Sequence, residues 1–163
     1  MDDSTDIMWP SEFAPTRAPV HVANRLTSAA APEAVWAWLV RASGWPHWYP
    51  NSHRVRIEGG KLELEPAARF AWSTFGVSLV SQVEEFVPGK RIAWNARGLG
   101  VWAYHAWLIE PRGTGCLIVT EETQYGVLAR LGHFFAPQRM SRGHQMWLER
   151  LDAKALAGPP ADS

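Results

Sequence analysis

The feature that most constrains the fold is a series of short strand-like runs between residues 53 and 124. Runs such as RFAWSTF, VSLVSQVEEF and VWAYHAWLIE alternate apolar and polar residues or are rich in β-branched and aromatic residues. Short glycine or proline clusters, for example Pro88-Gly89, separate them. Connections this short can join only antiparallel neighbours, because a parallel pair needs a long crossover. The sequence therefore predicts a meander of five or six antiparallel strands.

Helical patterns flank this meander on both sides. A first strand is predicted over Pro19–Thr27, followed by a helix that Pro32 begins and Gly44 ends. A second helical pattern starts at Val127, and Pro137 should kink or split it. This order predicts an α+β fold in which a curved sheet wraps around a long C-terminal helix, with short helices after the first strand. One helix cannot fill the hollow of a curled sheet, so we expect a cavity between the two.

The length of the chain fits one domain. A chain of 163 residues is expected to form a single domain. We predict that this domain spans residues 17–157, with an N-terminal tail of residues 1–16 and a C-terminal tail of residues 158–163. The N-terminal tail mixes Asp, Ser, Pro and Thr without any period and is predicted to be flexible. Trp9 and Phe13 are its candidate attachments to the domain surface.

Composition argues against several classes of protein. Sixteen basic and sixteen acidic residues cancel, so no net field attracts nucleic acid. No run approaches the roughly 20 apolar residues of a membrane span. The single cysteine and the acidic start of the chain, which does not resemble a signal peptide, predict a cytoplasmic protein. The spacing of His and Cys residues predicts no metal site, and no cofactor is expected.

Three segments resemble the polyketide cyclase/dehydrase branch of the START-like (SRPBCC) superfamily. They are APEAVWAWLVRASGWPHWYPNS, RFAWSTFGVSLVSQVEEFVPGKRIAWNA and HAWLIEPRGTGCLIVTEET. The resemblance spans residues 19–157 and depends on the ordered series rather than on one motif. The chain departs from the family pattern at Ala67-Ala68 and at GTGCLI. The resemblance implies a helix-grip fold, a seven-stranded curved sheet around a long C-terminal helix, with a pocket for a small hydrophobic or aromatic molecule.

The resemblance also suggests which strand residues face that pocket. It directs His105 and Trp107 inward, and aligning Cys116 with an inward threonine of the family places Ile118 and Glu122 inside. His105 and Glu122 are then a candidate acid/base pair, because an imidazole with a pKa near 6.5 can accept and return protons. The alternatives are a hydrogen-bonded core histidine and an exposed or ion-paired carboxylate.

Further ligand contacts are predicted on the strands, on the C-terminal helix and in the stretch SGWPHWYPN. In that stretch we expect Trp45 to be core and His47 to face solvent, while two other aromatic residues form the rim of the cavity. The full set of predicted ligand-binding residues is Trp48, Tyr49, Trp72, Trp94, Trp107, Ile118, Met140, His144 and Trp147.

Three functions are compatible with this sequence. The first is the binding of a small hydrophobic or aromatic ligand, lipid-like or polyketide-like, in the internal cavity. The second is a cyclase or dehydratase that uses His105 and Glu122. The third is a module that binds a partner protein through its helix or a sheet edge. A solid interior would favour the third function over the other two.

Overall fold

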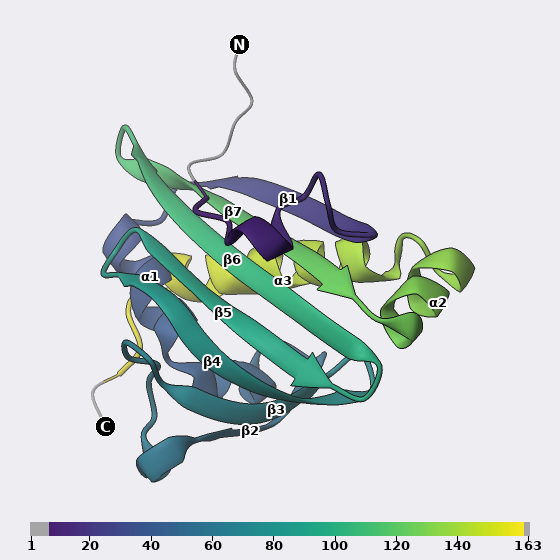
Figure 1. The fold of residues 1–163 in the computed structure, drawn as a ribbon. Helices are drawn as coiled ribbons and strands as arrows, with labels where there is room; N and C mark the ends of the chain where they lie inside the picture. Colours follow the sequence, from purple (N-terminus) through teal and green to yellow (C-terminus); the bar gives the residue numbers. More distant parts are fainter. Residues whose placement is uncertain (1–6, 162–163) are drawn as a thin grey trace.

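A computed structural model describes residues 7–161 and shows a seven-stranded antiparallel sheet curved around a long C-terminal helix (Figure 1). The sheet order is β1-β7-β6-β5-β4-β3-β2, so six strands form the predicted meander and β1 pairs with the last of them. The predicted helix-grip architecture is confirmed. The strands are β1 Val20–Ser28, β2 Ser52–Ile57, β3 Arg69–Thr74, β4 Val77–Val87, β5 Arg91–Gly98, β6 Val101–Arg112 and β7 Gly115–Tyr125.

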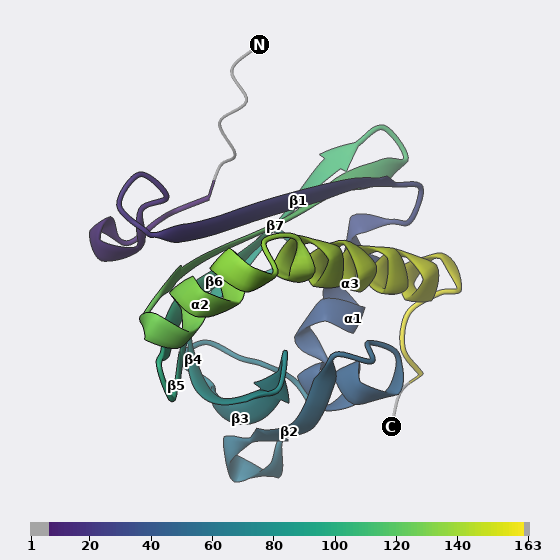
Figure 2. The same ribbon diagram turned by 90° about the vertical axis from the view of Figure 1, so that its right-hand side faces the viewer.

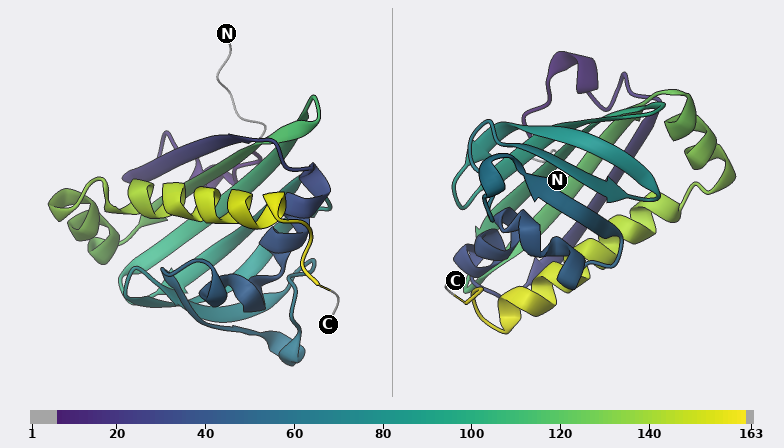
Figure 3. Two further views of the ribbon diagram at one scale, coloured as in Figure 1. Left: turned by 180° about the vertical axis from the view of Figure 1, so that it is seen from behind. Right: turned by 90° about the horizontal axis from the view of Figure 1, so that it is seen from below.

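The three α-helices lie on the concave side of the sheet (Figure 2 and Figure 3). Figure 2 shows the sheet curling around α3, and the left view of Figure 3 shows α3 lying across the strands. Pro137 lies between α2 and α3, as the predicted split requires. No helix of the described residues is long and apolar enough to cross a membrane. The helices are α1 Pro32–Val40, α2 Val127–Phe135 and α3 Arg139–Leu156, and three short 3-10 helices are η1 Ser11–Phe13, η2 Ala42–His47 and η3 Glu58–Gly60.

A glycine at the end of β7 determines where α2 lies. Gly126 has a φ of 111°, a conformation that side-chain-bearing residues rarely adopt. A Cβ at this position would lie 2.2 Å from the carbonyl oxygen of Gly100 in the β5–β6 region of the sheet. The backbone N–H of Leu128 donates a hydrogen bond of 3.0 Å to the same carbonyl. Gly126 therefore lets α2 close over one end of the sheet.

An aromatic core fills the other part of the space between α3 and the sheet. Trp45 and Trp147 are both fully buried, with ring centroids 5.0 Å apart at a steep angle. The Trp45 N–H donates to the carbonyl oxygen of Leu39 at 2.9 Å, which satisfies its polar atom inside the core. Trp45 is thus a core residue and His47 is exposed, as predicted.

The first and last described segments of the chain both pack against the domain. Phe13 is buried on the outer face of the sheet beside Tyr104, with ring centroids 5.3 Å apart. The Thr123 hydroxyl donates to the carbonyl oxygen of Phe13 at 2.9 Å. At the other end, the Trp38 N–H donates to the carbonyl oxygen of Gly158 at 2.7 Å. The sequence predicts a flexible tail over residues 1–16, but Ile7 and Phe13 of this stretch are buried against the sheet. Residues 1–6 lie outside the described part of the chain.

Candidate functional site

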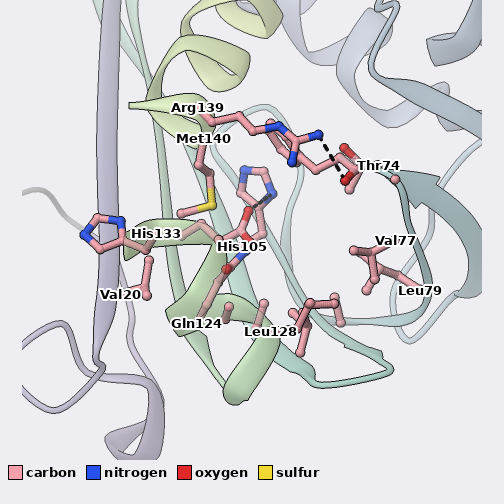
Figure 4. Close-up of a pocket in the computed structure, with 18 of the residues that line it drawn as sticks. Val20, Thr74, Val77, Leu79, His105, Gln124, Leu128, His133, Arg139 and Met140 are labelled. Carbon is pink, nitrogen blue, oxygen red and sulfur yellow. Dashed lines mark hydrogen bonds and ion pairs between the residues drawn. The ribbon is translucent and has the colours of Figure 1, made fainter. Parts of the chain in front are cut away.

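A cavity of about 340 Å³ lies between the concave face of the sheet, α2 and the start of α3 (Figure 4). Its walls are mainly apolar, and polar side chains gather at a few positions among them. The apolar lining includes Val20, Trp72, Val77, Leu79, Trp94, Val101, Ala103, Leu128 and Met140. The polar lining includes Thr74, His105, Glu122, Gln124, His133 and Arg139.

The polar group with the closest contacts contains His105, Glu122 and His144. His105 on β6 and Glu122 on β7 are directly opposite each other in the strand register. The Nδ1 of His105 lies 3.1 Å from Oε2 of Glu122. The Nε2 of His144 on α3 lies 3.2 Å from the same oxygen. We call these three residues the His-Glu-His cluster; all three are buried, and His105 and Glu122 line the cavity.

Alternation along β7 explains why Glu122 rather than its neighbour belongs to this cluster. Successive side chains of a strand point to opposite faces of the sheet. Glu121 therefore points to the outer face, where its Oε2 lies 2.9 Å from Nε2 of His21 on β1. Glu122 points inward on the same face as Thr120, whose hydroxyl oxygen lies 2.7 Å from Nε2 of His105.

Burial and hydrogen bonding set the charges of the cluster. Burial lowers the pKa of His105 well below its ordinary value and outweighs the opposing effect of the Glu122 carboxylate. For Glu122, burial alone would raise the pKa, but the interactions with His105 and His144 and the hydrogen bond from Gln124 at 2.5 Å lower it overall. At neutral pH the site therefore combines a buried carboxylate with the neutral imidazole of His105.

Aromatic rings enclose the cluster on its other sides. The ring of His105 stacks against that of His144, with centroids 4.7 Å apart at 26°. His105 also stacks on Trp107 at 5.5 Å and lies 5.1 Å from the ring of Trp94. Because these surroundings are largely apolar and the cluster is buried, interactions of its charged and polar groups are stronger than they would be in water.

Five of the residues predicted for the site line the cavity: Trp72, Trp94, His105, Glu122 and Met140. His144 contacts Glu122 from behind this wall, and Trp107 and Ile118 lie in the core without lining the cavity.

The aromatic residues expected at the cavity rim lie in the core. Tyr49 is fully buried and stacks on Trp147 with centroids 4.5 Å apart, and neither lines the cavity. The Tyr49 hydroxyl donates to the carbonyl oxygen of Gly143 at 3.2 Å, and burial raises its pKa. Trp48 is also buried and lines no part of the cavity. The 3-10 helix η2 turns this stretch toward α3, which explains why it packs inside rather than at the rim.

Several cavity residues were not identified from the sequence. Gln124 follows Glu122 by two positions, so continuing the alternation of β7 could have placed it on the inner face. Arg139 and His133 line the cavity from the helical region, and Arg139 also donates to the carbonyl oxygen of Phe75 at 3.3 Å. No local pattern could have identified these two residues, because their positions depend on how α2 and α3 are joined.

Comparison with known proteins gives a family and several solved structures. Residues 19–155 match the family model described as polyketide cyclase / dehydrase and lipid transport. The hypothetical protein jhp0584 from Helicobacter pylori is similar over 95% of this chain and 99% of that chain, with 31% identity and a TM-score of 0.87. TTHA0849 from Thermus thermophilus is 17% identical over 86% of this chain and 100% of its own, with a TM-score of 0.69.

A third similar structure is that of a protein from a biosynthetic pathway. The di-domain ARO/CYC StfQ from the steffimycin biosynthetic pathway is similar to this chain with 17% identity and a TM-score of 0.70. The match covers 85% of this chain and 51% of that one. At this identity the similarity shows the shared fold. Among curated proteins, the sequence comparison finds no match.

Proposed function

Because the chain belongs to the polyketide cyclase/dehydrase and lipid transport family, we propose that it binds a small hydrophobic or aromatic molecule in the cavity beneath α2. The observation that carries this proposal is an apolar cavity with a buried carboxylate and imidazole in its wall. Ligand sites are commonly apolar hollows with a few polar groups that orient the ligand. The apolar part of the ligand would contact Trp72 and Trp94, while its polar group would meet His105 and Glu122.

The size of the cavity favours a compact ligand. Ligand pockets usually measure roughly 300–1,000 Å³, and an engineered protein cavity of about 150 Å³ holds one benzene molecule. The cavity here, about 340 Å³, has room for about two fused aromatic rings. We therefore propose a bicyclic aromatic or similarly small polyketide-like ligand rather than a long-chain lipid. The cytoplasmic location expected from the sequence remains part of this proposal.

Calorimetric titration with 2-naphthol tests this proposal, with naphthalene as a probe that lacks the polar group. We expect 2-naphthol to bind and naphthalene to bind more weakly. Ala129→Phe places a ring in the cavity from α2 and should weaken 2-naphthol binding by at least about tenfold, or about 1.4 kcal/mol. Ala129 is buried and lines the cavity.

Leu131→Phe is the matched control on the same helix. Leu131 is 48% exposed and does not line the cavity, so this variant should bind 2-naphthol like the natural protein. Equal weakening by both variants, or binding that neither changes, would contradict a ligand site beneath α2.

An enzyme of the cyclase or dehydratase type is the second candidate. The observation that favours it is the 3.1 Å contact between His105 Nδ1 and Glu122 Oε2 in the cavity wall, where a bound substrate would reach both groups. In such an enzyme the apolar walls orient the substrate and the pair moves a proton to or from it. A solid interior would have favoured the third function, the binding of a partner protein. The interior contains a cavity instead, so this observation does not favour that function.

A further inference from the structure

The three residues of the His-Glu-His cluster come from three different elements and converge on one point. Among the described residues, their ligating atoms all lie within 4.8 Å of one another. The sequence predicts no metal site because these residues are far apart in the chain. Two imidazole nitrogens and one carboxylate oxygen are nevertheless a ligand set that zinc and other divalent transition metals accept.

Two of the three separations within the cluster are close to those expected around a shared metal ion. Metal–nitrogen and metal–oxygen bonds of about 2.0–2.1 Å at a tetrahedral angle separate two ligating atoms by about 3.3 Å. The Oε2 of Glu122 lies 3.1 Å from the Nδ1 of His105 and 3.2 Å from the Nε2 of His144. Coordination would require the stacked imidazole rings of His105 and His144, now at 26° to each other, to turn so that one nitrogen of each points at the ion.

Neighbouring residues hold two of the three proposed ligands, His105 and Glu122, whereas the Nδ1 of His144 is buried without a hydrogen-bond partner within residues 7–161. A metal-binding histidine usually donates its other N–H to an oxygen, which fixes the orientation of its ring. The hydroxyl oxygen of Thr120 lies 2.7 Å from Nε2 of His105 and can accept that hydrogen bond. Gln124 donates to Oε1 of Glu122, the carboxylate oxygen that the two histidines do not contact.

We propose that His105, Glu122 and His144 bind one divalent transition-metal ion such as Zn²⁺. Because His105 and Glu122 line the cavity, the remaining coordination position faces the proposed ligand site. Three protein ligands with an open fourth position are the arrangement of catalytic rather than structural zinc sites. The ion would bind an oxygen or nitrogen atom of a ligand directly. This proposal does not depend on the identity of the ligand in the cavity.

Titration of the untagged, chelator-treated protein with Co²⁺ and Zn²⁺ tests the site. We expect one ion per chain, a visible absorption spectrum for bound Co²⁺, and its loss when Zn²⁺ is added. His105→Gln, Glu122→Gln and His144→Gln should each lower the affinity by at least about 100-fold, because each removes one of three ligands. Thr120→Val leaves all three ligands in place and should lower the affinity about 10-fold to 100-fold.

His133→Gln is the matched control, since His133 lines the cavity but is not part of the cluster. It should bind Co²⁺ like the natural protein. X-ray absorption of Co²⁺ bound to the natural protein needs no variant and should show two imidazole ligands. Absence of binding, unchanged affinity in the cluster variants, or a spectrum without imidazole would overturn the proposal. Its failure would leave 2-naphthol binding unaffected, so the two proposals are tested separately.

Discussion

Glu122 is the residue on which both the enzyme hypothesis and the proposed metal site depend. A buried carboxylate without partners would cost several kcal/mol, and this one has His105, His144 and Gln124 around it. The two carboxylate oxygens of Glu122 have different partners. Both histidines contact Oε2, and Gln124 donates a hydrogen bond to Oε1. These contacts hold the carboxylate in one position in the wall of the cavity.

At the residue scale, the enzyme hypothesis predicts that binding and turnover separate. His105→Gln and Glu122→Gln remove the groups that would move a proton, so each should reduce turnover of a poly-β-ketone substrate by about 10²-fold to 10⁴-fold. The affinity for 2-naphthol should change far less, because the apolar walls remain. Product formation followed by mass spectrometry, with 2-naphthol titration in parallel, makes this comparison. Equal turnover in the natural protein and both variants would exclude the pair as proton carriers.

At the scale of elements, α2 and α3 differ in how many buried residues they contribute to the interior. α3 carries the buried residues Trp147, Leu148 and Leu151 across the concave face. α2 has one buried residue, Ala129, and leaves Phe134 and Phe135 more than three-quarters exposed. α3 therefore contributes much of the core, whereas α2 contributes a wall of the cavity.

Two leucines on α3 provide a matched test of this division. Leu148 is fully buried and Leu156 is 56% exposed. Leu148→Ala should lower the free energy of unfolding by about 2–5 kcal/mol because it leaves a cavity in the core. Leu156→Ala should change it by no more than about 0.5 kcal/mol. Urea unfolding followed by tryptophan fluorescence measures both, and similar losses in the two variants would contradict the assigned role of α3.

At the scale of the whole molecule, local patterns were enough to predict the sheet. Alternation and short turns predicted the meander, whereas the inward placement of Glu122 came from the resemblance to the family, through the alignment of Cys116. Long-range packing was not encoded in such patterns: His144 reaches Glu122 only because α3 crosses β7. In the same way, Tyr49 was expected at the rim, yet its ring stacks on Trp147 of a helix distant in sequence.

The most direct test of the central claim is a crystal structure of the protein with 2-naphthol. We expect the two rings to lie between Trp72 and Trp94 in the cavity beneath α2. We also expect the hydroxyl to lie within hydrogen-bonding or coordination distance of the His-Glu-His cluster. A molecule bound elsewhere on the protein, with this cavity filled only by water, would contradict the claim that the cavity is the ligand site.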